Sequence, residues 1–145
     1  MNTYDKPLPR ITDQSRRFWE SARSGVIELP RCDSCGAFHT YFEPWCNVCG
    51  HEGAHWDPVS PQGRIWANCR FHKTYFAGFD EDVPYNVAIV ELDDGPRLVT
   101  NIIDLESGSL SEMPIGMRVE AVFEAVTDEV TLIKFRPAST MGRER

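Results

Sequence analysis

Four cysteines in two close pairs are the residues of this chain best suited to chemistry. They are Cys32, Cys35, Cys46 and Cys49, with two residues inside each pair and a glycine after each pair. This spacing lets both thiolates of a pair turn toward one point, and the glycine permits the positive φ that aims backbone N–H groups at the sulfurs. Four thiolates complete a tetrahedral shell, which suits Zn²⁺ best and iron second.

A metal site is favoured over disulfides by the rest of the sequence. Residues 1–6 lack the apolar region of a signal peptide, and no run approaches the ~18 apolar residues of a membrane span. We therefore expect a cytoplasmic protein in a reducing compartment, where thiols stay free to bind metal. Paired cysteines at this spacing are also among the more specific metal signals in a sequence.

The closed shell predicts the role of the metal as well as its identity. Four protein thiolates leave no coordination position for water or substrate, so the metal is expected to be structural. The segment 29–56 is too short and polar to fold around a core of its own. Metal binding should therefore supply its folding free energy, about 10 kcal/mol in comparable small sites.

The other reactive side chains lack the neighbours that catalysis needs. Cys69 is expected on the inward face of an alternating strand, where a free cysteine acts as a small apolar residue. His51 and His55 flank the second cysteine pair and are expected to lie beside the cluster without ligating it. The chain contains no nucleotide-binding glycine loop, metalloprotease helix or nucleophile elbow. We predict no catalytic residue in this chain.

The acidic balance of the chain counts against nucleic-acid binding. Its 15 Lys and Arg residues and 22 Asp and Glu residues give a formal charge of −7. Affinity for nucleic acid depends on cations that neutralise phosphates. A nucleic-acid-binding zinc ribbon is therefore the weaker alternative, and an iron electron carrier is another, which the red colour of an iron tetrathiolate would reveal.

The sequence around the cysteines divides into four expected parts. These are an N-terminal arm and helix (1–28), a zinc ribbon (29–60), a barrel (61–137) and a flexible tail (138–145). Thr12 and Gly25 predict the two ends of the helix. Phe18 and Trp19 share one stripe of it, which suits either packing within this chain or docking to a partner. A strand over 26–29 and a hairpin over 37–42 are expected to carry the cysteine pairs.

Five strand-like runs follow the break at 57–63. They cover residues 63–72, 84–92, 97–103, 117–126 and 130–135, with a turn at 93–96 and a longer loop at 104–116. Five short antiparallel strands with a longer connection after the third favour a small Greek-key barrel such as the OB-fold. The expected fold is thus mostly β, with an N-terminal helical segment, a rubredoxin-like zinc ribbon and a five-stranded OB-fold barrel.

The order of these parts resembles one family closely. Its pattern is an FW-containing helix, a ribbon L-x-R-C-x-x-C-G…C-x-x-C-G and an OB-fold. The matching residues are Phe18-Trp19, Leu29-Pro30-Arg31-Cys32, Cys46-Asn47-Val48-Cys49-Gly50, Trp56, Gly63, Pro84-Tyr85, Glu91-Leu92, Gly95-Pro96-Arg97, Gly116-Met117 and Lys134-Phe135. The chain is similar over almost its whole length to the rubredoxin-like zinc ribbon plus OB-fold family called domain of unknown function 35. It departs from the family at 42–45, where members often carry Pro-Pro-Arg, and at Asn47, where proline is usual.

The resemblance implies a catalytic partner. Members look like accessory subunits of thiolase-fold enzymes that act on acyl-CoA, including thiolases with acyltransferase activity and retro-aldolases. The implied function is that of a non-catalytic zinc-binding subunit in a hetero-oligomer, needed for the partner's activity on CoA thioesters. The catalytic residue then belongs to the other chain.

Aromatic and cationic side chains are the expected contacts with that partner or with CoA. Aromatic clusters are typical of interface hot spots, and cations suit the phosphates of CoA. The expected contact residues are Phe18, Trp19, Arg31, Phe42, Trp45, Arg70 and Lys73.

Overall fold

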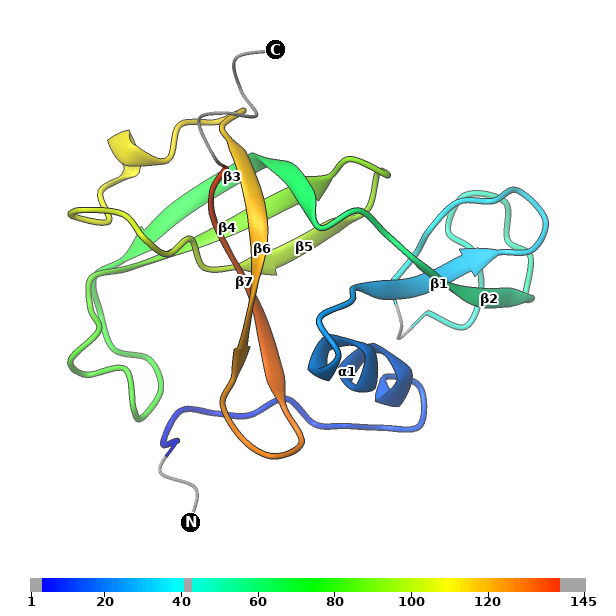
Figure 1. Ribbon diagram of the computed structural model, residues 1–145, viewed down its shortest axis with the longest axis horizontal. Coiled ribbons are helices and arrows are strands. Elements are labelled where there is room, and N and C mark those ends of the chain that lie inside the picture. Colours follow the sequence, from blue (N-terminus) through cyan, green and yellow to red (C-terminus); the bar gives the residue numbers. More distant parts are fainter. Residues whose placement is uncertain (1–3, 41–42, 139–145) are drawn as a thin grey trace.

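The structure is a computed structural model that describes residues 4–40 and 43–138 (Figure 1). Its elements are α1 (Arg16–Arg23), β1 (Glu28–Cys32), β2 (Ala54–Pro58), β3 (Gln62–Phe71), β4 (Tyr85–Leu92), β5 (Arg97–Thr100), the 3₁₀ helix η1 (Leu110–Glu112), β6 (Arg118–Ala125) and β7 (Thr131–Pro137). The described part is mostly β with one short N-terminal helix, which confirms the predicted fold class. None of its helices has the length and apolar character needed to cross a bilayer.

The larger sheet has the strand order β5-β4-β3-β6-β7, with every neighbouring pair antiparallel. It curls into a half-barrel, and the segment that follows the end strand β5 meets the other end strand, β7, at a parallel bridge between Ile102 and Phe135. There the Phe135 amide donates to the Asn101 carbonyl (3.1 Å) and the Ile103 amide donates to the Phe135 carbonyl (2.7 Å). The predicted turn at 93–96 joins β4 to β5, and Gly95 adopts the φ of 112° that favours glycine.

One hydrophobic core connects the helix, the ribbon and the barrel. Phe18 and Trp19 of α1 pack edge to face, with ring centroids 4.9 Å apart, and join Leu29 of β1 and Phe135 of β7 in the same cluster. Figure 1 shows α1 between the β1–β2 sheet and the β6–β7 hairpin, and the helix contacts strands of both. The cysteine-bearing ribbon is therefore anchored to the barrel through shared apolar side chains.

Two local predictions in the N-terminal half need correction. The helix begins at Arg16 instead of near Thr12, because the Thr12 hydroxyl accepts a hydrogen bond from the Ser15 amide (3.2 Å) and closes a separate turn. Among the described residues, the expected hairpin over 37–42 reduces to a bridge between Arg31 and Phe38, because β1 pairs along its length with β2. Residues 41–42 lie outside the described part.

The expected inward position of Cys69 is wrong, because β3 contains a bulge. Ile65 pairs with Val90 but Ala67 pairs with Ile89, so the register shifts by one residue. A shift of one residue exchanges the two faces of the strand. Asn68 consequently points inward and donates to the Met113 carbonyl (2.6 Å), while Cys69 is exposed.

The boundaries of the four predicted parts stay predictions. β2 ends at Pro58 and β3 begins at Gln62, so the break between ribbon and barrel falls inside the expected segment. Of the predicted tail 138–145, only Ala138 is described, and its amide donates to the Arg118 carbonyl (3.0 Å).

Candidate metal centre

Two similar turns position the four cysteines. The first turn begins where β1 ends, at Cys32, and the Gly36 amide donates to the Cys32 carbonyl (3.0 Å). In the second, the Gly50 amide donates to the Cys46 carbonyl (2.8 Å). Both glycines have positive φ, 79° and 80°, as the sequence pattern predicts. The Cys46 amide also donates to the His51 carbonyl (2.9 Å), which continues the second turn beyond Cys49.

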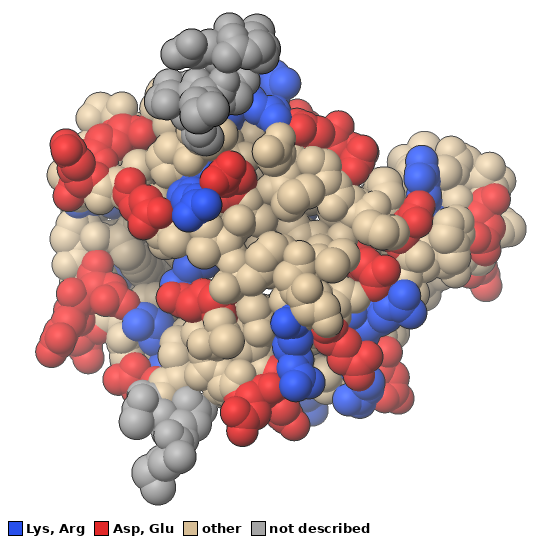
Figure 2. All heavy atoms as spheres, viewed as in Figure 1, with Lys and Arg blue, Asp and Glu red and all other residues tan. Residues whose placement is uncertain are grey.

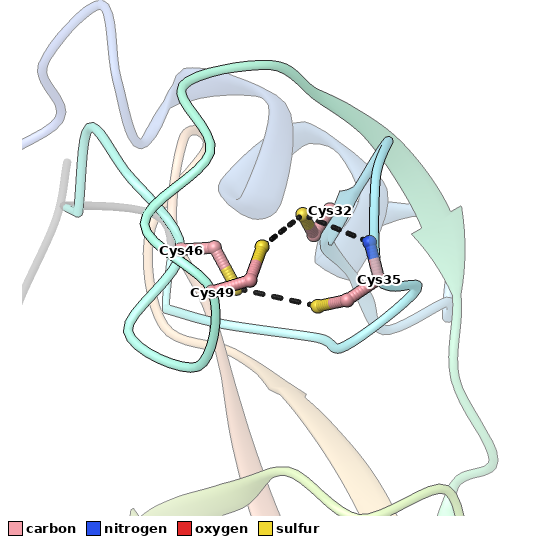
Figure 3. Close-up of side chains that lie close together, drawn as sticks. All are labelled: Cys32, Cys35, Cys46 and Cys49. Carbon is pink, nitrogen blue, oxygen red and sulfur yellow. Dashed lines mark hydrogen bonds between the residues drawn. The ribbon is translucent and has the colours of Figure 1, made fainter.

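The four sulfurs point toward one another (Figure 3). All four Sγ atoms lie within 4.8 Å of one another, and the Sγ atoms of Cys32 and Cys49, and of Cys35 and Cys46, are 3.6 Å apart. A tetrahedron with metal–sulfur bonds of 2.3 Å has sulfurs about 3.8 Å apart. The donor set and its spacing therefore fit one tetrahedral thiophilic metal ion. Within residues 4–40 and 43–138 no other group of three or more Cys, His, Asp or Glu is gathered in this way.

Backbone amides prepare part of this cluster to be anionic. The amides of Cys35 and Ser34 lie 3.4 and 3.3 Å from the Cys32 sulfur and lower the pKa of that thiol to about 6, against desolvation. The Cys49 and Val48 amides likewise lower the pKa of Cys46. The Ala37 amide favours the Cys35 thiolate, but desolvation and the Cys46 sulfur outweigh it and raise the pKa of Cys35 to about 12.

This pattern suits a site that binds a cation. Four thiols at this separation cannot all lose their protons without a positive charge between them, so the backbone favours only some thiolates. A bound metal ion would replace the remaining protons. The cysteine cluster is therefore suited to hold a metal ion, because backbone amides already favour the thiolate form of Cys32 and Cys46.

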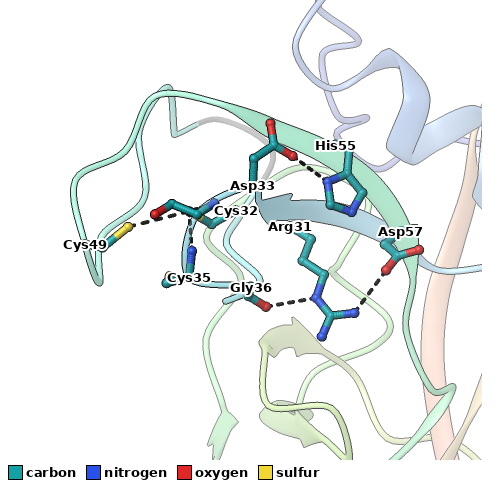
Figure 4. A network of polar contacts seen from close by, with 9 residues as sticks. Arg31, Cys32, Asp33, Cys35, Gly36, Cys49, His55 and Asp57 are labelled. Carbon is teal, nitrogen blue, oxygen red and sulfur yellow. Dashed lines mark hydrogen bonds and ion pairs between the residues drawn. The ribbon is translucent and has the colours of Figure 1, made fainter.

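Polar contacts hold the first turn against β2 (Figure 4). The Arg31 guanidinium donates to the Gly36 carbonyl (2.9 Å) and pairs with Asp57 (3.1 Å). His55 Nδ1 lies 2.6 Å from the Asp33 carboxylate. Neither His55 nor His51 belongs to the group of clustered ligand atoms, in line with their predicted place beside the cluster. The Asp33–His55 contact was not foreseen, because it depends on the pairing of two strands far apart in the sequence.

The predicted aromatic contact residues have different environments. Phe18 and Trp19 are only 6% and 8% exposed, so packing within the chain accounts for both. As they lie in the structure, they offer little surface to a partner. Trp45 is 56% exposed beside the second cysteine pair. Phe42 lies outside the described residues.

The predicted cationic contact residues do not form one patch. Arg31 belongs to the ribbon and also covers the Phe38 ring, 4.9 Å from its centroid. Arg70 lies at the far end of β3, where it donates to the Ser107 carbonyl (3.2 Å), and Lys73 follows in the β3–β4 loop (Figure 1). Figure 2 shows acidic and basic side chains interspersed over the visible face, without a basic stripe. The charge distribution on this face does not resemble a nucleic-acid-binding surface.

Comparison with known proteins identifies relatives over most of the chain. A family model described as the C-terminal OB-fold domain of ChsH2 matches residues 56–124. A "DUF35 domain-containing scaffold protein" of Pyrococcus furiosus is 32% identical over 134 residues, covering 86% of this chain and 93% of the relative. A "Probable enoyl-CoA hydratase alpha subunit" of Thermomonospora curvata is 31% identical over 135 residues, covering 92% of this chain. This chain spans only 40% of the length of that relative.

A solved structure shares the fold as well as the sequence. The chain resembles a chain of the "Ltp2-ChsH2(DUF35) aldolase" with a TM-score of 0.77 and 29% identity. The match covers 91% of this chain and 100% of that chain.

Proposed function

This chain belongs to the DUF35 family, and on that premise we propose that it is a non-catalytic, zinc-binding subunit of a cytoplasmic enzyme complex that acts on CoA thioesters. The catalytic subunit of that complex is proposed to have the thiolase fold, as a thiolase or an aldolase. This chain would position or stabilise that subunit, while the reacting groups belong to the partner.

The observation that carries the proposal is the structural match. The solved chain that this chain covers completely is part of an aldolase whose name joins Ltp2 to ChsH2(DUF35). The Thermomonospora curvata relative is named as one subunit of a probable enoyl-CoA hydratase, and the Pyrococcus furiosus relative is named a scaffold protein. The names of these relatives thus agree on a scaffold or subunit role, although this chain spans only 40% of one of them and 93% of another. Fold likeness alone would not support a function.

Zinc is the metal proposed for Cys32, Cys35, Cys46 and Cys49, because an all-thiolate tetrahedral set suits Zn²⁺ in a reducing compartment. When bound, zinc would supply a crosslink between the two cysteine turns. The chain's own amides would orient the thiolates, and its four sulfurs would leave no position for substrate. The ribbon would therefore act as a rigid support.

The ribbon tip, defined here as Trp45 and Val48, is the proposed partner contact. These side chains flank Cys46 and are 56% and 70% exposed. An exposed tryptophan on a rigid support is the kind of residue that dominates protein interfaces.

Replacing Trp45 by alanine should therefore weaken binding of the thiolase-like partner by about thirtyfold, the effect of a typical interface hot spot. The partner to test is a thiolase-like protein from the same organism, and the affinity is measured by titration calorimetry on folded, zinc-loaded protein. Trp66→Ala is the matched control, because Trp66 is 46% exposed but lies on β3 of the barrel. Equal affinities for the two variants would place the interface elsewhere. Failure of wild-type protein to bind any thiolase-like protein would refute the functional proposal itself.

A further inference from the structure

A pocket of about 410 Å³ lies where the helix, the ribbon and the barrel meet. Its lining comes from three places in the chain: Phe18 and Trp19 of α1, Leu29 and Thr40 of the ribbon, and residues 97–101 and 132–134 of the barrel. Small-molecule pockets typically measure about 300–1,000 Å³ and are lined mainly by apolar side chains. This pocket has the size and lining of a site for a small apolar ligand.

The pocket exists because the end strands of the barrel do not pair along their length. The segment just after β5 meets β7 at the Ile102–Phe135 bridge, next to which the Thr100 hydroxyl donates to the Ile133 carbonyl (2.9 Å). No ladder joins β5 to β7 in the described sheet. Phe18 and Trp19 cover this opening with side chains instead of a strand. The space is therefore built into the topology of the barrel.

Two buried polar atoms in the pocket lining have no hydrogen-bond partner among residues 4–40 and 43–138. They are Nε1 of Trp19, in a side chain only 8% exposed, and Oγ1 of Thr40. Each atom exposes almost no surface, so a ligand in the pocket would reach either one only after a side chain moves. A buried unpaired donor or hydroxyl is unfavourable, and an oxygen acceptor would relieve it. Rotation of Thr40 about χ1 is the movement that would turn its hydroxyl toward a ligand.

The charges around the pocket favour an anionic ligand. Arg97 and Lys134 line it, and no Asp or Glu does, although the whole chain has a formal charge of −7. Both cations also pair with a carboxylate outside the lining, Arg97 with Glu91 (3.2 Å) and Lys134 with Glu124 (2.7 Å). The Arg97 guanidinium also lies over the Trp66 ring, 3.9 Å from its centroid, and each cation retains donors that these contacts do not use. An anionic oxygen at the pocket mouth would therefore meet two cations, each of which it would share with one carboxylate, Glu91 or Glu124.

We propose that this pocket binds a medium-chain aliphatic carboxylate, with its chain against Phe18, Trp19 and Leu29 and its carboxylate toward Arg97 and Lys134. The site belongs to this chain alone, so it is independent of the complex proposed above. It can be tested on the zinc-loaded protein without a partner.

Calorimetric titration with octanoate, octan-1-ol and octylamine tests the proposal directly. Octanoate should saturate one site per chain and bind about tenfold more tightly than octan-1-ol, because hydrogen bonds to a charged group are stronger than neutral ones. Octylamine should not saturate. Octanoate that fails to saturate, or that binds no better than octan-1-ol, overturns the proposal.

Substitutions locate the site. Val99 lines the pocket but is 73% exposed, so Val99→Trp should fold and reduce octanoate affinity more than tenfold by filling the space. Ile115→Trp is the matched control, because Ile115 is 63% exposed and does not line the pocket. Lys134→Met should reduce octanoate affinity to that of octan-1-ol and leave octan-1-ol binding unchanged, and Arg97→Met is the second variant of this kind. Equal octanoate affinity in Val99→Trp and Ile115→Trp would place binding elsewhere and refute the site.

Thr40→Val should affect the stability of the free protein and its affinity for octanoate in opposite directions. Removing an unpaired buried hydroxyl should leave the melting temperature of the free protein unchanged or higher, while octanoate binds about fivefold more weakly. A lower melting temperature with unchanged octanoate affinity would contradict the role given to Thr40. If Val99→Trp abolishes binding of the catalytic partner while octanoate does not bind wild type, the pocket is a protein contact and the ligand proposal fails.

Discussion

Replacing Cys46 by serine should reduce the bound zinc from about one ion per chain to near zero and unfold the ribbon between 33 and 53. The described part of this segment contains no strand, and its turns are organised around the four sulfurs. Metal binding contributes on the order of 10 kcal/mol in comparable small sites, whereas a single hydrogen bond or exposed ion pair of the described part contributes about 1 kcal/mol. Elemental analysis and amide hydrogen exchange measure the two effects.

Cys69→Ser is the matched control for this experiment, because Cys69 is exposed on β3 and away from the cluster. It should retain both the zinc and the amide protection. The amount of bound zinc should also depend on pH, because protons compete with the metal for the thiolates. Zinc should be released as the pH falls and should bind again as the pH rises. Full zinc content and unchanged protection in Cys46→Ser would contradict a structural metal site.

Replacing Phe135 by alanine should lower the free energy of unfolding by about 3–5 kcal/mol, a large part of the roughly 5–15 kcal/mol that holds a domain together. The Phe135 side chain is fully buried, and its backbone makes the bridge that joins the two ends of the sheet. The cavity left by the ring therefore lies at the point where the barrel closes.

Urea denaturation followed by circular dichroism measures this change. Phe76→Ala is the control, because Phe76 is 61% exposed in the β3–β4 loop and its truncation should change stability by no more than about 0.5 kcal/mol. Similar denaturation midpoints for the two variants would show that Phe135 does not anchor the barrel.

The features that could be predicted from the sequence are those encoded locally. The cysteine cluster follows from spacing within each pair, and the turn at 93–96 follows from Asp93-Asp94-Gly95-Pro96 between two apolar runs. The stripe of Phe18 and Trp19 likewise follows from helical periodicity. Both residues are buried, in agreement with packing within the chain, one of the two roles that the sequence left open. In each case the residues that decide the structure are neighbours in the sequence.

The features that were missed depend on pairing between distant segments. The bulge after Ile65 is a matter of register against β4, so nothing within β3 itself reveals that Cys69 turns outward. The pairing of β1 with β2 brings Asp33 to His55 across the whole cysteine segment. The pocket requires the helix, the ribbon and both end strands to be assembled, and therefore has no signal in any one of them.

Reconstitution of catalysis from purified components tests the central claim most directly. The rate of CoA-thioester cleavage or formation is measured for the zinc-loaded chain alone, for the thiolase-like protein that it binds, also alone, and for the equimolar mixture. We expect no turnover by this chain, little by the partner and efficient turnover by the mixture. Four cysteines can close the coordination shell of a metal ion, and Cys69 belongs to no cluster of Cys, His, Asp or Glu in the part of the chain that the structure describes. Turnover by this chain alone that disappears in Cys69→Ala would contradict the account.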